Sequence, residues 1–435
     1  MQQPQTIIDF ARYVALGDSI TAGYMDGALC HYGQTNNYAY FLAQQLQAFG
    51  GGSFNQCLVS PYSIGLGFQG NSCLEKKNTS TSLSNQLFIE KESIDIGYIA
   101  PQGDLSLVAS NFYNSEKPFN NIGIPATKLP TLLFPSYGNP QHGAGNFNPF
   151  FTRMASNPLT ASALGDALLQ NPTFFTLFVG NNDALAYALS GCTEDALTPM
   201  NGEVGIGFEA SARALIQALT ANGAKGVISN LPNLDATSYF KTIPYNALLL
   251  NDTEALGLNK WYANFNLEFK EGKNAFIICD SVTDKNSIRQ LQKDEHILLD
   301  VLLDADKWLY LKGLSVIPKK YCLTADEIKT IQNRLDEYNS CLKQLAEEYQ
   351  LAFVDTNKIL KLRSADRVFN PISQNCFYKK DGVFSLDGLH PNPYGHVLLA
   401  NEMINQINTT YNTQVSLLDV NRYKNFQPPV LKVIN

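Results

Sequence analysis

The chain has 435 residues, of which 45% are hydrophobic and 16% are charged. This balance indicates a folded globular protein and excludes an intrinsically disordered one. The net charge of −7 disfavours a nucleic-acid-binding protein, because such proteins present a basic face. The sequence contains no apolar run of about 18 residues, so no membrane-spanning helix is expected.

The eight cysteines show no C-x-x-C spacing, which disfavours a zinc ribbon or a thioredoxin-like redox site. Cys57 and Cys73 flank a glycine-rich loop and are the first candidates for a disulfide, while buried reduced thiols are an equal alternative. Residues 1–5 are short and polar, unlike a signal peptide. This start fits a cytoplasmic protein or a mature exported protein without its leader.

Strand and helix patterns alternate along the chain. Apolar segments that end in polar or glycine-containing turns predict strands at 13–16, before 120–126, at 173–179, at 225–229 and at 352–354. Apolar residues at helical spacing predict helices at 37–49, 162–170, 208–221, 324–350 and 392–408, with a short helix over 127–134. The helix at 324–350 opens with a capping box, Thr324 to Glu327. The alternation predicts an α/β protein, a three-layer sandwich around a five-stranded parallel sheet.

Two long segments do not fit this alternation. Residues near 53–118 are irregular and polar, and residues near 240–320 carry aromatic and acidic clusters. Because the strand pattern continues on either side of them, we interpret both as large insertions in a single domain of residues 11–410. Residues 411–435 are then a C-terminal tail.

The first predicted strand ends abruptly at Gly17-Asp18-Ser19. In an open α/β sheet the functional crevice lies at the carboxyl ends of the strands, so Ser19 stands where a nucleophile is needed. Taken alone, Asp18 and Ser19 are more typical of a plain helix cap.

Three further loops carry polar residues that suit serine hydrolysis. In this reading Ser19 is the nucleophile, His390 removes its proton, and Asp387 orients the imidazole. Asn182 and backbone N–H groups of Ser19 and of the 121–127 turn donate to a developing oxyanion. Each residue alone fits a cap or a turn, but four such loops at one edge of one sheet predict a catalytic site.

Four short motifs occur in order: Gly17-Asp18-Ser19-Ile20, Asn121-Ile122-Gly123-Ile124-Pro125, Gly180-Asn181-Asn182-Asp183 and Asp387-Gly388-Leu389-His390. They resemble the four sequence blocks of the SGNH hydrolases, also called GDSL esterases and lipases. The resemblance spans residues 11–408 apart from the insertions. It implies a flavodoxin-like α/β/α fold and ester hydrolysis through an acyl-enzyme, and no metal or organic cofactor is expected.

The resemblance assigns the nucleophile to Ser19, the oxyanion-binding asparagine to Asn182, and the acid and base to Asp387 and His390. A further oxyanion donor falls on the backbone N–H of Ala126, where the family usually has glycine. Glycine reaches backbone angles that alanine avoids, so the geometry at Ala126 is the main departure from the family pattern.

Weaker motifs at 22–28, 221–226 and 323–327 resemble the larger exported members of the family from Bacteroidetes. This resemblance implies a periplasmic protein or an outer-membrane lipoprotein. The expected substrate is a small-molecule, lipid or sugar ester, with membrane association through a lipid anchor outside this chain and with no nucleic-acid partner.

Two alternatives use the same residues. A carbohydrate O-deacetylase would apply the same machinery to a sugar ester, and a catalytically inactive binding protein would use only the scaffold. Ala126 is the one feature that favours the inactive protein. The G-x-G-x-x-G motif at 65–70 lacks the strand and helix of a dinucleotide site. We interpret His31 as structural and His396 as a packing or surface residue.

Overall fold

The computed structural model describes residues 8–61, 66, 87–90, 95–98, 111–143, 145–361, 367–372, 375–378 and 382–424. Most of the predicted insertion near 53–118, including Cys73 and nearly all of the glycine motif at 65–70, therefore lies outside the described residues. Cys57 is described, and its thiol is free and buried.

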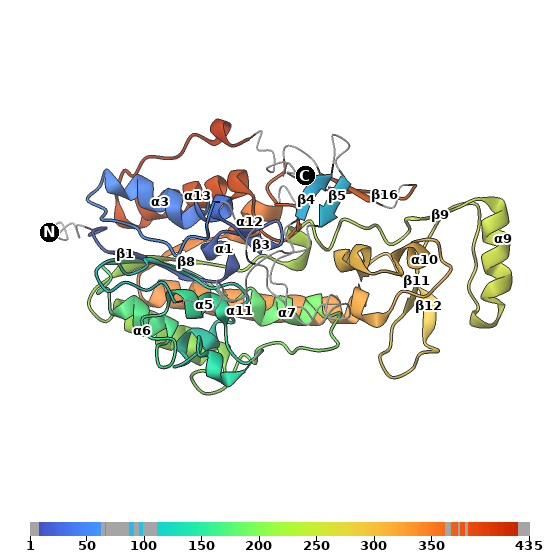
Figure 1. Cartoon of the computed structure of the whole chain (residues 1–435), viewed down its shortest axis with the longest axis horizontal. Coiled ribbons are helices and arrows are strands. Elements are labelled where there is room, and N and C mark those ends of the chain that lie inside the picture. Colours follow the sequence, from blue (N-terminus) through green and yellow to red (C-terminus); the bar gives the residue numbers. More distant parts are fainter. Residues whose placement is uncertain are drawn as a thin grey trace.

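A five-stranded parallel sheet forms the centre of the protein, with the strand order β15-β8-β7-β1-β6 (Figure 1). The strands are β1 (Tyr13–Gly17), β6 (Asn121–Gly123), β7 (Phe174–Phe178), β8 (Lys225–Ser229) and β15 (Ala352–Val354). Every residue of β1 and β7 is buried, as expected for strands that are covered on both faces. The predicted parallel sheet is confirmed.

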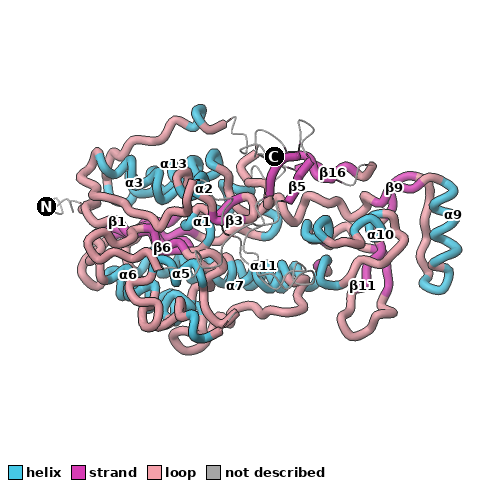
Figure 2. The backbone as a smooth tube through the Cα atoms, in the orientation of Figure 1, coloured by secondary structure: helices cyan, strands magenta, loops and turns pink. Residues whose placement is uncertain are grey.

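Helices cover both faces of this sheet (Figures 1 and 2). On one face lie α3 (Tyr38–Gln47) and α13 (Pro393–Tyr411), and on the other α6 (Ala163–Leu168), α8 (Phe208–Thr220) and α11 (Ala325–Glu348). The predicted capping box of α11 is present, because Thr324 and Glu327 each accept a hydrogen bond from the backbone N–H of the other. The three-layer sandwich is confirmed.

Shorter elements complete the described chain. The further α-helices are α1 (Ser19–Ala22), α2 (His31–Gln34), α5 (Pro149–Met154), α7 (Asn182–Leu189), α9 (Asp252–Trp261), α10 (Lys307–Leu311) and α12 (Thr356–Lys361). The predicted short helix over 127–134 is a 3₁₀ turn at Pro130–Leu133. Antiparallel pairs are β2 (Tyr24–Met25) with β3 (Ala28–Leu29), β4 (Leu87–Glu90) with β5 (Asp95–Tyr98), and β16 (Arg367–Asn370) with β17 (Asn375–Tyr378).

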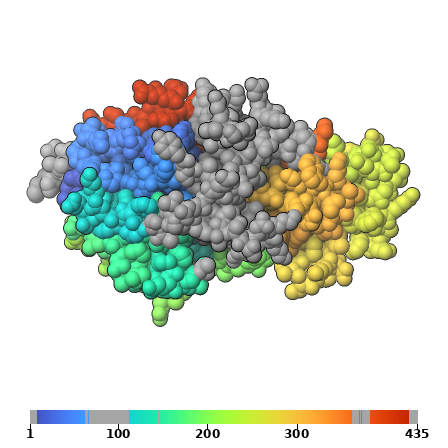
Figure 3. Space-filling model, in the orientation of Figure 1, coloured from blue at the N-terminus to red at the C-terminus, as the bar shows by residue number. Residues whose placement is uncertain are grey.

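The segment near 240–320 extends from one end of the sandwich, at the right of Figure 1 and in yellow and orange in Figure 3. It carries α9, α10 and the pairs β9 (Leu248–Leu250) with β10 (Gly272–Asn274), β11 (Ile277–Cys279) with β12 (Ile288–Gln290), and β13 (His296–Ile297) with β14 (Cys322–Leu323). Its buried side chains, such as Phe276 and Val301, belong to the same hydrophobic core as the sheet. The exact domain limits stay a prediction.

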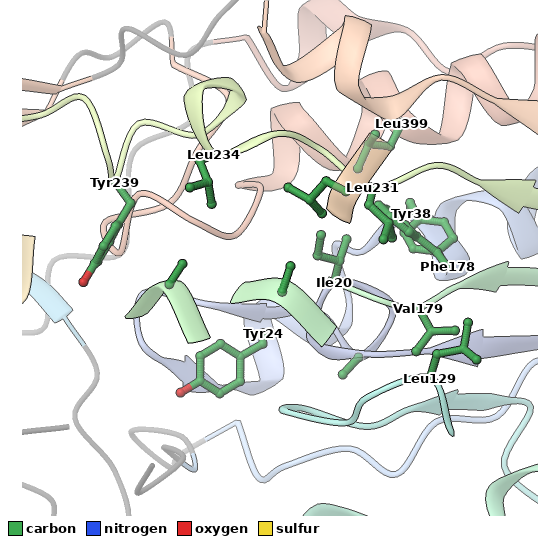
Figure 4. Close-up of a cluster of buried hydrophobic side chains, with 14 of the residues drawn as sticks. Ile20, Tyr24, Tyr38, Leu129, Phe178, Val179, Leu231, Leu234, Tyr239 and Leu399 are labelled. Atoms are coloured by element: carbon green, nitrogen blue, oxygen red, sulfur yellow. The ribbon is translucent and has the colours of Figure 1, made fainter. Parts of the chain in front are cut away.

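Gly17 allows the turn after β1 to lie against β7. The backbone N–H of Asp18 donates to the carbonyl oxygen of Phe178 at 3.2 Å, and a Cβ on Gly17 would lie 2.4 Å from that oxygen. Only glycine fits this approach. Just beyond the turn, Ile20 packs into the core near Leu231 and Tyr38 (Figure 4). The turn that carries Ser19 is therefore held by the hydrogen bond to β7 on one side and by the packing of Ile20 on the other.

We expect Leu177→Ala in the central strand β7 to lower the free energy of unfolding by about 2–5 kcal/mol, because it leaves a cavity in a closely packed core. Leu177 is 1% exposed, whereas Leu169 at the end of α6 is 65% exposed. The control Leu169→Ala should stay within about 0.5 kcal/mol of the parent. Urea unfolding measures both, and equal losses would contradict the described core.

Candidate active site

Asp18 and Ser19 have different roles in the turn after β1. Asp18 is the N-cap of α1, and its Oδ1 accepts a hydrogen bond from the N–H of Ile20 at 3.1 Å. Its other oxygen accepts from Asn181 Nδ2 at 2.7 Å. Burial raises the pKa of Asp18 to about 6. Asp18 is thus a cap, while the buried Ser19 turns its hydroxyl toward His390.

The structure brings Ser19, His390 and Asp387 into one hydrogen-bonded chain. His390 Nε2 lies 2.9 Å from Ser19 Oγ, and His390 Nδ1 lies 2.8 Å from Asp387 Oδ2. Asp387 Oδ1 accepts the N–H groups of Leu389 and His390, each at 2.8 Å. A hydroxyl, an imidazole and a carboxylate in this order are the arrangement that activates a serine nucleophile.

Electrostatics favour the protonated imidazole that such a reaction produces. Burial alone would lower the pKa of His390, but the Asp387 carboxylate raises it above the ordinary value, with smaller contributions from Asp18 and Asp26. Burial would raise the pKa of Asp387, yet His390 and the backbone N–H groups hold it well below its usual range. Asp387 therefore stays ionised while His390 gains and loses a proton.

The remaining predicted site residues meet beside β6. Asn182 begins α7, and its Nδ2 donates to the carbonyl oxygen of Thr127 at 2.9 Å, which leaves its amide a second N–H. Ala126 precedes Thr127 and has a φ of 61°, in the left-handed region that glycine prefers. Ala126 therefore adopts the left-handed backbone conformation that is typical of the glycine usually found at this position in the family. The oxyanion-binding roles of Ala126 and Asn182 stay predictions.

Asp183, in the first turn of α7, ties this helix to the segment after β6. The carboxylate is buried and accepts the N–H of Leu129 at 2.8 Å. Burial raises its pKa to about 7.

The other two histidines of interest are structural. His31 Nδ1 lies 2.9 Å from the carbonyl oxygen of Val59. His396 is fully buried in α13, where Nδ1 accepts the N–H of Tyr38 at 3.2 Å and burial lowers its pKa to about 3. Of the two readings of His396, packing is confirmed and the surface position is wrong.

The sequence reading missed the residues that surround the histidine from the β2–β3 hairpin. The ring of Tyr24 lies 4.8 Å from the ring of His390, centroid to centroid. Gly27, at the tip of the hairpin, donates its N–H to Asp387 Oδ2 at 3.1 Å. The signal was present, because an Asp-Gly pair such as Asp26-Gly27 is typical of a tight hairpin turn.

A small cavity of about 40 Å³ opens beside Ser19 and His390. Most of its wall is apolar and comes from α1, α7, α11 and the segment that follows β8. The apolar residues from these elements are Ile20, Ala184, Leu185, Pro232, Leu234, Phe240 and Leu335. Leu389 from the loop before α13, together with Asn181, Asn233 and Thr237, completes the lining. The cavity thus offers room for a small apolar group next to the hydroxyl of Ser19.

Two features are absent from the described part of the chain. There, no group of three or more His, Cys, Asp or Glu residues is arranged to hold a metal ion. Within the same residues, none of the helices combines the length and the apolar character that crossing a bilayer requires.

The sequence model of the GDSL-like lipase/acylhydrolase family matches residues 13–403. The chain belongs to this family. It is therefore a carboxylic ester hydrolase, and the prediction of serine-dependent ester hydrolysis is confirmed at the level of the family. No curated protein matches the chain significantly.

Solved structures that align with the chain include esterases. A single-substitution variant of Axe2, an acetyl xylan esterase from Geobacillus stearothermophilus, is 13% identical, with 91% of this chain and 93% of that chain covered and a TM-score of 0.34. LAE5, an α/β hydrolase from the metagenome of Lake Arreo in Spain, is 11% identical, with 93% and 96% covered and a TM-score of 0.35. The family assignment rests on the sequence model and not on these likenesses.

We expect Ala126→Gly to raise the free energy of unfolding by about 0.5–1 kcal/mol. The substitution relieves the left-handed strain of about 1–2 kcal/mol, and the greater freedom of glycine in the unfolded chain offsets part of this gain. Chemical denaturation of the two proteins measures the difference. A lower stability of the glycine variant would show that Ala126 is not strained.

Proposed function

We propose that this protein hydrolyses esters of short-chain carboxylic acids through a covalent acyl-enzyme on Ser19. The observation that carries the proposal is the hydrogen-bonded chain from Ser19 through His390 to Asp387, which borders a small apolar cavity. Serine hydrolysis needs this chain of groups, and the cavity suits the acyl part of the substrate.

The reaction follows from these contacts. Ser19 Oγ attacks the ester carbonyl carbon while His390 Nε2 takes the hydroxyl proton. The tetrahedral intermediate collapses, the bond to the alcohol oxygen breaks, and His390 returns the proton to the departing alkoxide. Water then attacks the acyl carbon with His390 again as base, the bond from this carbon to Ser19 Oγ breaks, and His390 returns the proton to Ser19 Oγ as the carboxylic acid leaves. Asp387 remains ionised and stabilises each imidazolium.

The negative charge of the intermediate needs donors on the carbonyl oxygen. We assign this role to the backbone N–H groups of Ser19 and Ala126 and to the side-chain amide of Asn182. The hydrogen bond from Asn182 to Thr127 supports the assignment, because it holds the amide against the turn that carries Ala126. Each such donor contributes about 3 kcal/mol to the transition state.

We infer the length of the acyl group from the size of the cavity. Its volume of about 40 Å³ is well below the ~150 Å³ of an engineered apolar cavity that binds benzene. An acetyl to butyryl group therefore fits better than a long acyl chain. The same small cavity favours a second candidate, hydrolysis of acetyl esters on a carbohydrate, which differs only in the alcohol.

Export and a lipid anchor stay predictions that rest on the resemblance in sequence.

The roles are tested by Ser19→Ala with p-nitrophenyl acetate and butyrate. Since the catalytic groups act as a unit, we expect the variant to lose on the order of 10⁴-fold or more in kcat. Hydrolysis of a peracetylated sugar by the parent tests the second candidate. Equal activity of parent and variant would show that Ser19 is not the nucleophile.

The acyl preference is tested by comparing acetate, butyrate and octanoate esters. We expect kcat/KM for the octanoate ester to be at least about tenfold below that for the butyrate ester, because an eight-carbon acyl chain is too long for the cavity. Leu185→Ala should enlarge the cavity and reduce this ratio. Leu189→Ala, on the same helix but not in the lining, is the control. A flat chain-length profile in the parent would contradict the assigned acyl pocket.

A further inference from the structure

The turn of the β2–β3 hairpin carries a buried carboxylate, that of Asp26, next to the loop of residues 385–390 (the catalytic loop). Its two turn residues, Asp26 and Gly27, have φ angles of 54° and 78°. Positive φ at both positions is the signature of the tight turn that joins two adjacent strands. Asp26 is only 2% exposed, although aspartates are rarely buried without specific partners. The contacts of this carboxylate therefore carry its role.

Three hydrogen bonds join the hairpin tip to consecutive residues of the catalytic loop. Asp26 donates its N–H to Ser385 Oγ at 3.0 Å, and its Oδ1 accepts the N–H of Leu386 at 2.7 Å. Gly27 donates its N–H to Asp387 Oδ2 at 3.1 Å. That oxygen is also the one that contacts His390 Nδ1. The hairpin thus helps to hold the carboxylate of Asp387 in place, together with the N–H groups of Leu389 and His390.

The same hairpin contacts the imidazole directly. The hydroxyl of Tyr24 donates to the carbonyl oxygen of Gly27 at 2.5 Å, which holds the Tyr24 ring over the turn. The ring centroids of Tyr24 and His390 are 4.8 Å apart. One short hairpin therefore contacts the acid, the base and the loop that joins them.

We propose that Asp26 is a positioning residue for Asp387 and His390. It fixes the register of their loop through Leu386 and places a further negative charge near the imidazole. This inference rests on the proposed function of that pair. Asp26 does not contact the substrate or the reacting hydroxyl in this account. It acts through the geometry and the charge of the two residues that do.

The charges around His390 decide the expected pH dependence. The carboxylates that act on its imidazole are Asp387, Asp18 and Asp26, and all three favour the protonated form. The nearby His396 on α13 is neutral in the pH range of the reaction, because burial lowers its pKa to about 3. Asp26 also faces the thiol of Cys30 and the hydroxyl of Tyr32, both neutral at pH 7 because burial raises their pKa values. Removing the charge of Asp26 therefore lowers the pKa of His390. Since the reaction needs neutral His390 as the base, the acidic limb of kcat/KM moves to lower pH.

Two substitutions separate geometry from charge. Asp26→Asn keeps an oxygen that accepts the N–H of Leu386 but removes the negative charge. We expect its kcat at pH 8 to stay within about fivefold of the parent, and its acidic limb to move down by about 0.3 pH unit or more. Asp26→Ala removes the acceptor as well, and we expect kcat to fall by about 10- to 100-fold with little change in KM, because Asp387 is misplaced.

Asp166→Asn is the matched control. Asp166 is also a buried carboxylate that accepts a backbone N–H, from Ser156 at 2.9 Å, but it lies on α6 away from His390. Its variant should lose thermal stability without moving the pH limb. Thermal unfolding of every variant identifies any that fails to fold, and NMR titration of the histidine ring protons follows His390 without a substrate.

Two results would overturn the inference. One is a folded Asp26→Ala variant with kcat within twofold of the parent. The other is an Asp26→Asn variant whose acidic limb and His390 titration coincide with those of the parent. If Ser19→Ala retains full activity, the proposed function itself fails. If only the Asp26 variants behave like the parent, the inference alone fails.

Discussion

The hydrogen bond between Ser19 and His390 is the constraint on which the site depends, because it joins residues that are 371 positions apart. Ser19 is held by β1, whose end lies between β6 and β7 in the sheet. His390 is held by the loop before α13, which packs against α3 and β15. The sandwich aligns these two ends to within hydrogen-bond distance, so the catalytic geometry is a property of the whole sheet and its helices.

Burial gives this contact its chemical character. Asp18, Asp26 and Asp387 all lie close enough to raise the pKa of His390 against the effect of its burial. Asp18 accepts the N–H of Ile20, and Asp26 accepts the N–H of Leu386. Asp387 accepts the N–H groups of Leu389 and His390. These hydrogen bonds fix the positions of the charges, and fixed charges stabilise an imidazolium without having to reorganise during the reaction.

The long elements and the residues that form the hydrogen-bonded chain of the candidate site could be predicted because their signals are local. An apolar strand that stops at Gly17, or a helix that starts at Thr324, is visible in a few consecutive letters. The hairpin contact of Asp26 with Leu386 could not be predicted, because it joins two loops through tertiary packing alone. The left-handed angle of Ala126 also follows from the turn around it and contradicts the preference of the residue. Most of the predicted insertion near 53–118 lies outside the described residues.

The central claim is that Ser19 is a nucleophile activated by His390. Covalent labelling with a fluorophosphonate tests it most directly, because this reagent needs an activated serine but no knowledge of the natural ester. The account predicts a single phosphonylated peptide that contains Ser19, labelled rapidly in the parent and at least about 100-fold more slowly in a folded His390→Ala variant. Labelling at another serine, or equal labelling without His390, would contradict it.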